Sequence, residues 1–231
     1  MRKIVNGVKG FEKDRGALIF YEQFKALRAK FEHQLDSRKY KVVAVTSSIA
    51  EEGKTCTCVN LAANLASIGR KKVLLVDADL RKSDLAHYLN VSTKPGLSDY
   101  LNGSAPLEKV INKTMEGLYF IPGGERTNGA SELLAGEKFR SFLVQMRDKF
   151  DLILLDTPPV LPVADTMSIK DQVDAFIFIF RMGFTPYVML RQVIEDMGKE
   201  KIIGVVLNRV EPQSQKYYKR YYGKYYHKIS V

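Results

Sequence analysis

One short stretch of the sequence could bind phosphate groups: SIAEEGKT, residues 48–55. It lies between an apolar, β-rich run and a helix-like segment, and it fits the pattern G-x-x-x-x-G-K-[ST] except that Ser48 replaces the first glycine. In such a loop, backbone N–H groups and the N-terminus of the following helix bind phosphate oxygens. Lys54 would reach the β- and γ-phosphates of a nucleotide, and Thr55 would bind Mg²⁺. The nucleotide-binding residues expected in this stretch are Ser48, Glu52, Gly53, Lys54, Thr55 and Cys56.

The same loop contains two carboxylates. Glu51 and Glu52 are unusual neighbours for an anion, and we expect them to lower the affinity for nucleotide when Mg²⁺ is absent. The plain alternative is an accidental Gly-Lys-Thr at the start of a helix. The order of strand, loop and helix favours the phosphate site.

Two further stretches carry acidic residues at the ends of apolar runs. VDADLR (76–81) places Asp77 and Asp79 two residues apart, where they can face a metal ion and a reacting hydroxyl together. LILLDTPPV (152–160) places Asp156 after four apolar residues, as in a Walker B strand whose acid supports Mg²⁺. Two aspartates that only end a strand and cap a helix are the plain alternative for the first stretch. The three stretches together predict a nucleotide and metal site.

The elements that must position these residues are alternating strands and helices. Short apolar runs predict buried strands, and apolar residues at helical spacing predict helices between several of them. This alternation indicates an α/β fold with a mainly parallel sheet covered by helices on both faces, in which ligands bind at the carboxyl ends of the strands. The expected strands cover residues 42–47, 72–79, 118–124, 151–159, 174–180 and 202–208, and the expected helices cover 17–33, 55–69, 137–150 and 186–198.

Charge is distributed unevenly along the 231 residues, whose net charge is +10. Residues 1–40 carry ten basic and five acidic side chains, residues 212–231 carry five basic and no acidic ones, and the middle is neutral. We expect an N-terminal arm and helix in residues 1–40, one domain in 41–211 and a tail in 212–231. A neutral body with basic ends argues against a folded nucleic-acid groove and favours an acidic partner or a membrane surface.

Other features of the sequence indicate a cytosolic protein. Cys56 and Cys58 lie two apart in an expected helix, so neither a disulfide nor a zinc site is expected, and a reducing compartment fits best. No apolar run approaches the roughly 20 residues of a membrane span. Residues 1–16 contain no apolar signal core, so we do not expect secretion.

The tail has a composition that a folded core cannot use. KYYKRYYGKYY (216–226) holds six of the twelve tyrosines of the chain, interleaved with lysine, arginine and glycine. It lacks an apolar pattern, so we expect a disordered tail. Its tyrosines are Tyr217, Tyr218, Tyr221, Tyr222, Tyr225 and Tyr226.

These features together resemble the bacterial tyrosine autokinases of capsule and exopolysaccharide synthesis. That family has a P-loop, a D-x-D-x-R motif, a D-T-P-P Walker B motif and a tyrosine-rich tail, which SIAEEGKT, VDADLR, LLDTPP and the segment 216–226 resemble. The similarity extends over about residues 17–226. It includes PGLSDYLNG (95–103), ASELLAGEKF (130–139), DTPPVLPVAD (156–165) and IIGVVLNRV (202–210).

The resemblance implies a P-loop NTPase fold of the ParA/MinD type and a protein-tyrosine kinase that uses ATP and Mg²⁺. Asp77 would activate the tyrosine hydroxyl, Asp79 and Asp156 would support the ion, and Asn208 would contact adenine. The six tail tyrosines would accept phosphate. The implied catalytic residues are Lys54, Asp77, Asp79 and Arg81, and the implied metal ligands are Thr55, Asp77, Asp79 and Asp156.

The resemblance also implies partners. These are other copies of the chain in a ring, an octamer in the family, a membrane-spanning activator of the polysaccharide co-polymerase type, and a protein-tyrosine phosphatase. The kinase would lie at the inner face of the bacterial cell membrane, and no nucleic-acid partner is expected. In the ring, one subunit would phosphorylate the tail of its neighbour. Each phosphate adds roughly −1.5 to −2 charges, so about three would cancel the charge of the tail, and further phosphates would release it and dissociate the ring.

Two positions depart from the family pattern. The family loop reads P-G-E-G-K, where this chain has Ala50 and Glu51 in place of Pro-Gly. The family helix carries E-x-x-R-x-x-R, which pairs subunits, where this chain has Glu22, Lys25 and Arg28. Lysine keeps the charge but loses the bidentate fork of arginine, so a weaker ring is expected. The plain alternative is a solvated helix face with an i,i+3 ion pair worth a few tenths of a kcal/mol, roughly.

Other functions fit the same motifs less well. Partition and division-site ATPases place a signature lysine five residues before the P-loop lysine, and that position is Ile49 here. A nucleotide-binding scaffold with little turnover, which regulates a membrane polymerase, is a second alternative, motivated by the two loop glutamates. An RNA-binding tail is a third, because aromatic and basic residues alternate in it.

Overall fold

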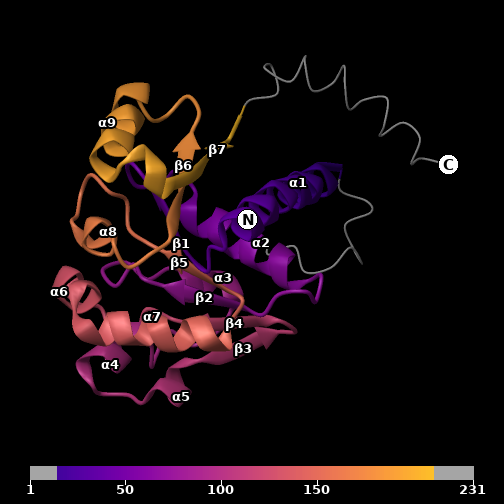
Figure 1. The fold of residues 1–231 in the computed structure, drawn as a ribbon. Coiled ribbons are helices and arrows are strands. Elements are labelled where there is room, and N and C mark those ends of the chain that lie inside the picture. Colours follow the sequence, from indigo (N-terminus) through magenta and orange to yellow (C-terminus); the bar gives the residue numbers. More distant parts are fainter. Residues whose placement is uncertain (1–14, 211–231) are drawn as a thin grey trace.

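A computed structural model describes residues 15–210, with side chains from Ile19 onward, around a seven-stranded β-sheet (Figure 1). The strand order is β3-β4-β2-β5-β1-β6-β7, and every neighbouring pair is parallel except β3–β4. The strands are β1 Val42–Ser47, β2 Val73–Asp77, β3 Asn112–Met115, β4 Leu118–Ile121, β5 Leu152–Asp156, β6 Ala175–Arg181 and β7 Ile202–Asn208.

The six strands expected from apolar runs are all present, and the prediction of a mainly parallel sheet is confirmed. β1, β2 and β5 are buried along their whole length, which is why they read as continuous apolar runs. The sequence analysis missed β3, because this edge strand reads Asn-Lys-Thr-Met and has no fully buried residue.

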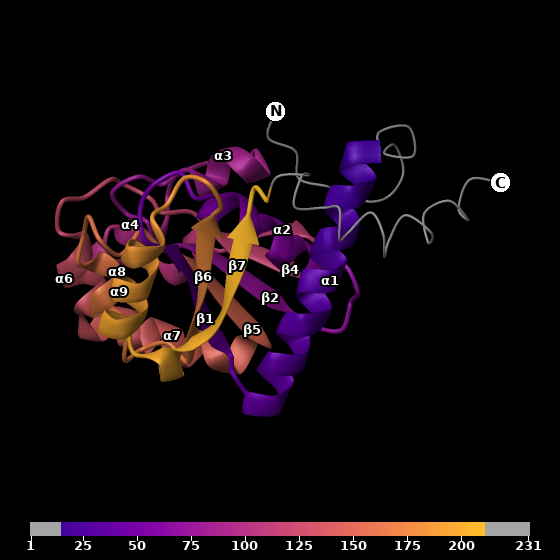
Figure 2. The ribbon, with the colours of Figure 1, turned by 90° about the horizontal axis from the view of Figure 1, so that it is seen from above.

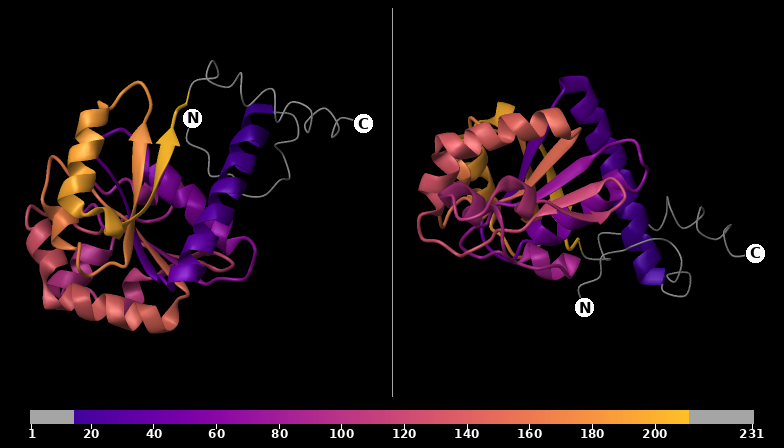
Figure 3. Two further views of the ribbon diagram at one scale, coloured as in Figure 1. Left: turned by 45° about the horizontal axis from the view of Figure 1, so that its top comes forward. Right: turned by 90° about the horizontal axis from the view of Figure 1, so that it is seen from below.

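Helices cover both faces of the sheet, as Figures 2 and 3 show. Two apolar clusters of the core lie on opposite faces, one beneath α1, α2 and α3 and the other beneath α4 to α9. The first group is α1 Arg15–Arg38, α2 Lys54–Ala66 and α3 Leu85–Leu89. The second is α4 Leu97–Asn102, α5 Leu107–Val110, α6 Ala130–Ala135, α7 Glu137–Lys149, α8 Asp165–Ser168 and α9 Tyr187–Met197, followed by the 3₁₀ turn η1 Lys199–Lys201.

The long N-terminal helix packs on the sheet through its second half. The apolar spacing predicts a helix over residues 17–33, and α1 extends further, to Arg38. Phe31 and Leu35 are buried in the cluster beneath α2, so this part of the helix is fixed by the core. Lys39 then takes a left-handed conformation, with φ 56°, which ends the helix before β1.

The domain limits expected from charge remain a prediction. The sheet and the helices from α2 onward fall within the expected body, residues 41–211, and α1 falls within the expected N-terminal part, residues 1–40. The expected tail, 212–231, lies outside the described residues. Among the helices of residues 15–210, none has the length and apolar character that crossing a membrane requires.

Candidate active site

The three predicted stretches meet at the carboxyl ends of neighbouring strands. Asp77 is the last residue of β2 and Asp156 the last of β5, and the two are direct partners in the register of these parallel strands. β5 also pairs with β1, after which the loop 48–53 begins. The fold therefore brings Asp77, Asp156 and the loop together, as the sequence predicted.

The loop enters α2 through a glycine that no other residue can replace easily. Gly53, the N-cap of α2, has φ 94°, and no side chain caps this helix end. A Cβ atom at this position would lie 2.2 Å from Nδ2 of Asn208. The first N–H groups of a helix have no partner within the helix, so the start of α2 offers donors to an anion, beginning at Lys54.

Glu52 does not face this anion site. Its side chain is fully buried, and its carboxylate accepts hydrogen bonds from the backbone N–H of Ile49 (2.9 Å) and of Arg181 (3.2 Å) and from the hydroxyl of Thr185 (2.5 Å). The partners of this carboxylate are therefore groups of the protein, and a contact of Glu52 with nucleotide and an effect of its charge on binding remain predictions. Only the exposed Glu51 carries free negative charge in the loop.

Asp77 is a buried carboxylate held by three donors. Oδ2 accepts hydrogen bonds from the Ser83 hydroxyl (2.6 Å) and the Leu85 N–H (3.2 Å), and Oδ1 accepts one from the Asp79 N–H (3.2 Å). Burial and the charge of Asp156 raise the pKa of Asp77 well above its usual value. A carboxyl group with a raised pKa is a better proton acceptor at neutral pH than an ordinary one.

Asp156 lies beside the lysine of the loop. Burial raises its pKa to about 7, while the charge of Lys54 and the hydroxyl of Thr55 act in the opposite direction. Lys54 is itself largely buried. Oδ1 of Asp156 and the hydroxyl oxygen of Ser48 are both buried, and neither has a hydrogen-bond partner among the residues that the structure describes. A bound cation and a bound nucleotide would supply the partners that these two oxygens lack.

Asp79 and Arg81 have separate environments. Burial raises the pKa of Asp79, and its Oδ1 accepts a hydrogen bond from the Lys82 N–H at 2.9 Å. Arg81 instead forms a bidentate pair with Asp165, with Nε at 2.8 Å from Oδ2 and Nη2 at 3.0 Å from Oδ1. Its guanidinium is thus directed toward the start of α8, and its assignment as a catalytic residue remains a prediction.

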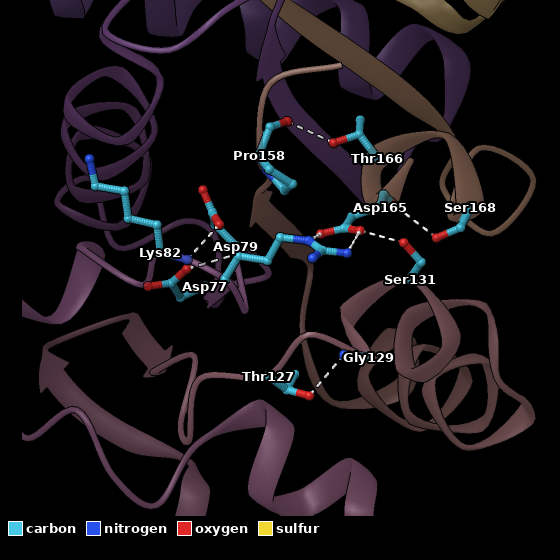
Figure 4. A network of polar contacts seen from close by, with 11 residues as sticks. Asp77, Asp79, Lys82, Thr127, Gly129, Ser131, Pro158, Asp165, Thr166 and Ser168 are labelled. Atoms are coloured by element: carbon cyan, nitrogen blue, oxygen red, sulfur yellow. Dashed lines mark hydrogen bonds and ion pairs between the residues drawn. The ribbon is translucent and has the colours of Figure 1, made fainter. Parts of the chain in front are cut away.

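Asp165 is a site residue that no motif of the sequence indicates. This residue is fully buried, and Ser131 of α6 donates a hydrogen bond to it in addition to Arg81 (Figure 4). Although burial acts in the opposite direction, these hydrogen bonds hold the pKa of Asp165 below its usual value. Asp165 ends the stretch DTPPVLPVAD, but nothing in that stretch indicates its partner, which lies 84 residues earlier.

The donors present fit a magnesium nucleotide. In residues 15–210, no three His, Cys, Asp or Glu side chains are grouped closely enough to hold a metal by themselves. In proteins, Mg²⁺ usually binds through one or two carboxylates and completes its coordination shell with phosphate oxygens and water. Asp156 with its orphaned oxygen and Thr55 beside it would hold the ion, and Asp77 and Asp79 lie next to them.

Two other expected nucleotide residues have structural partners. Nδ2 of Asn208 donates a hydrogen bond to the Glu52 carbonyl at 2.8 Å, so the end of β7 is joined to the loop. The Cys56 carbonyl accepts one from Asn60 at 2.8 Å, and burial raises the pKa of the Cys56 thiol. Both cysteines are free thiols. Contacts of Asn208 with adenine and of Cys56 with phosphate remain predictions.

The helix residues expected at a subunit interface form ion pairs along α1. Lys25 Nζ lies 2.7 Å from Glu22 Oε1, and Arg28 Nε lies 3.6 Å from Glu32 Oε2. These i,i+3 and i,i+4 pairs are what a solvated helix face would also show, so a role in assembly remains a prediction. The six expected phosphoacceptor tyrosines lie outside the described residues.

The fold and the site define a class of protein, the P-loop NTPases. A family model described as an AAA domain matches residues 40–179. The chain is 35% identical over 202 residues to the tyrosine-protein kinase ptk of Acinetobacter johnsonii, which covers 86% of this chain. It is 33% identical over 200 residues to the tyrosine-protein kinase CpsD of Streptococcus agalactiae serotype III, which covers 85% of both chains. The chain belongs to the family of bacterial tyrosine kinases.

Relatives and solved structures place the chain within this family. It is 30% identical over 200 residues to the succinoglycan biosynthesis transport protein ExoP of Rhizobium meliloti, which covers 83% of this chain. It spans 27% of the length of ptk and 25% of that of ExoP. The VpsO kinase domain superposes with a TM-score of 0.76 at 31% identity, covering 85% of this chain and 98% of that domain. The septum site-determining protein MinD of Pyrococcus horikoshii, solved with Mg-ADP, is more distant, with a TM-score of 0.63 at 26% identity over 76% of each chain.

Proposed function

We propose that this chain is an ATP-dependent protein-tyrosine kinase that transfers the γ-phosphate of ATP to tyrosines of the tail of a neighbouring subunit. The observation that carries the proposal is the pairing of Asp77 with Asp156 at adjacent strand ends, beside the buried Lys54. Membership in the bacterial tyrosine kinases supports the reaction, and Tyr217, Tyr218, Tyr221, Tyr222, Tyr225 and Tyr226 supply the acceptors.

The residues of the site have separate tasks in this reaction. The N–H groups at the start of α2 and Lys54 bind the phosphates. Asp77 accepts the proton of the tyrosine hydroxyl, whose ordinary pKa of about 10 makes it a poor nucleophile at neutral pH. Asp156, Asp79 and Thr55 would hold Mg²⁺, which supplies positive charge to the transferred phosphoryl group. Arg81, fixed by Asp165, would hold the loop that carries Asp79.

The setting of this activity is the synthesis and export of polysaccharide at the cell membrane. The similarity to CpsD and to the succinoglycan transport protein ExoP supports it. A membrane-spanning activator of the co-polymerase type would bring the kinase to the inner face of the membrane, and a phosphatase would reverse the reaction. The kinase would act as a ring of subunits that dissociates when the tails are heavily phosphorylated.

A single variant pair tests the proposal. Purified protein is incubated with ATP and Mg²⁺, and phosphate is located by mass spectrometry. Lys54→Met is expected to abolish tyrosine phosphorylation, whereas Lys109→Met, which removes the same charge from an exposed position on α5, is expected to leave it intact. Activity of Lys54→Met equal to that of the wild type would contradict the site, and phosphate found mainly outside residues 217–226 would contradict the tail as substrate.

The oligomeric switch has its own test. Lys54→Met protein, which cannot phosphorylate itself, is measured by light scattering before and after phosphorylation by active enzyme. The expected result is a fall in mass from oligomer to monomer as the phosphate count rises above about three per tail. A mass that does not depend on the phosphate count would refute the switch and leave the kinase reaction untouched.

Two of the three alternative functions, the partition-type ATPase and the low-turnover scaffold, have less support. The signature-lysine position of the partition and division-site ATPases is Ile49, whose N–H is used to bind Glu52. The low-turnover scaffold was motivated by weak nucleotide binding through Glu51 and Glu52. Because the Glu52 carboxylate is occupied by hydrogen bonds from Ile49 and Thr185, this motivation is weaker for Glu52 than for the exposed Glu51.

A further inference from the structure

A buried carboxylate in the phosphate loop needs an explanation, because burying a charge is costly unless hydrogen bonds compensate it. Glu52 is fully buried. Its carboxylate receives three hydrogen bonds from the protein: one from within its own loop (Ile49), one from the last residue of β6 (Arg181) and one from the segment after it (Thr185). We call this group of four residues the Glu52 clamp.

The clamp joins parts of the chain that are about 130 residues apart in sequence. One oxygen of the carboxylate, Oε2, closes the loop on itself through the Ile49 N–H. The other, Oε1, fixes the loop to the end of β6 through the Arg181 N–H and the Thr185 hydroxyl. The backbone of the loop is also joined to β6, because the Arg181 guanidinium donates a hydrogen bond to the Glu51 carbonyl at 3.3 Å.

The conformation that the clamp holds is an unfavourable one for this sequence. Glu51 has φ 65° and Gly53 has φ 94°, so two residues of the loop on either side of Glu52 are left-handed. A non-glycine residue in this region is strained and persists only where its surroundings determine it. Glu51 stands where a glycine would remove this strain, so the loop depends on the clamp for its shape.

We propose that Glu52 is a positioning residue, which through Thr185, Arg181 and Ile49 holds the phosphate loop in its nucleotide-binding conformation and so sets the affinity for nucleotide. Its carboxylate does not touch the phosphates. The proposal rests on the nucleotide site of the proposed kinase, but it requires no phosphoryl transfer. A loop already in its binding conformation avoids the free energy of ordering when the nucleotide binds.

Neutralising each loop glutamate separates this role from a simple effect of charge. Glu52→Gln and Glu51→Gln remove the same charge from the same loop. If charge alone mattered, both would bind an anion more tightly. The clamp predicts instead that Glu52→Gln weakens binding at least tenfold, because an amide cannot accept all three hydrogen bonds, whereas Glu51→Gln binds as tightly as the wild type or more tightly. The dissociation constant of a fluorescent ADP analogue, measured by titration with Mg²⁺ present, is the readout.

A second pair covers the case in which Glu52→Gln fails to fold. Thr185→Val removes the hydroxyl from a side chain of the same shape, and Thr185→Ser keeps it. Thr185→Val is expected to weaken ADP binding severalfold, and Thr185→Ser to restore it. A purely structural role would lower the melting temperature of Thr185→Val while its dissociation constant, measured well below that temperature, stays within twofold of the wild type.

These outcomes are independent of the proposed kinase reaction, because they use ADP binding alone. Tight ADP binding by Glu52→Gln, or equal dissociation constants for Thr185→Val and Thr185→Ser, would overturn the clamp even if tyrosine phosphorylation is found. Loss of binding in Glu52→Gln and Thr185→Val would support the clamp even if no tyrosine is phosphorylated.

Discussion

Replacing Asp156 by asparagine should stabilise the protein, in a way that depends on pH. The pKa of this buried carboxyl is raised from 3.8 to about 7. The folded state therefore holds the proton more tightly than the unfolded state does, so the free energy of unfolding falls as the pH rises from about 4 to about 7. The amide introduced by Asp156→Asn does not ionise, so the free energy of unfolding of the variant lacks this decrease with pH.

The size of the effect follows from the pKa difference. One pKa unit corresponds to about 1.4 kcal/mol. Relative to low pH, where the carboxyl is protonated in both states, the wild type has therefore lost about 1.6 kcal/mol of its free energy of unfolding at pH 5 and about 4 kcal/mol at pH 8. The difference in free energy of unfolding between Asp156→Asn and the wild type should accordingly increase by about 2–3 kcal/mol between these two pH values.

Urea denaturation followed by circular dichroism measures this difference, in buffer with EDTA and without nucleotide. Asp148→Asn, which makes the same substitution at an exposed position on α7, is the matched control. Because Asp156 raises the pKa of Asp77, removing its charge also relieves Asp77, which adds to the effect in the same direction. A difference that stays constant from pH 5 to pH 8, or that shrinks, would refute the reasoning.

Three further predictions concern single residues of the site. Asp77→Asn should lower the rate of tyrosine phosphorylation by about 10²–10⁴-fold, as the loss of a general base does. Its dissociation constant for ADP should stay within about threefold of the wild type, and an unchanged rate would remove Asp77 from the mechanism. Gly53→Ala should weaken ADP binding in calorimetry and lower the free energy of unfolding by about 1–2 kcal/mol, because its φ of 94° is left-handed; tight binding by this variant would argue against the loop conformation. Arg81→Ala leaves the buried Asp165 without its cation and should cost about 3 kcal/mol in urea denaturation, whereas Arg140→Ala, which breaks an exposed ion pair with Glu137, should change stability by less than about 1 kcal/mol.

Much of the site could be predicted because its residues follow buried strands directly. Asp77 and Asp156 end strands whose apolar runs are clear in the sequence, and parallel strands bring such ends to one edge of the sheet. Lys54 is placed by the glycine before it and the helix after it. In these cases the local sequence places each residue at the end of a strand or the start of a helix, and the parallel sheet brings those ends together.

The direction of a side chain was much harder to predict than its position. The Glu52 carboxylate accepts a hydrogen bond from Thr185, which lies 133 residues away. The Arg81 guanidinium pairs with Asp165, 84 residues away, and the roles expected of Glu52 and Arg81 at the nucleotide site remain predictions. Each direction is decided by a partner that only tertiary packing brings near, and a charged residue beside a motif carries no local signal of that partner. β3 was missed for a related reason, since an edge strand need not be apolar.

The ionisable groups at the strand ends act as one electrostatic unit, in which Lys54 has two effects. Its charge lowers the pKa of Asp156, which burial raises, and so favours the ionised form of that carboxyl. The ionised Asp156 in turn raises the pKa of Asp77, after burial the main cause of its shift. Lys54, the residue proposed to bind phosphate, therefore also helps to make Asp77 a stronger base, through its effect on Asp156. In the proposed reaction, phosphate binding and proton acceptance are not independent, and a variant of Lys54 should disturb both.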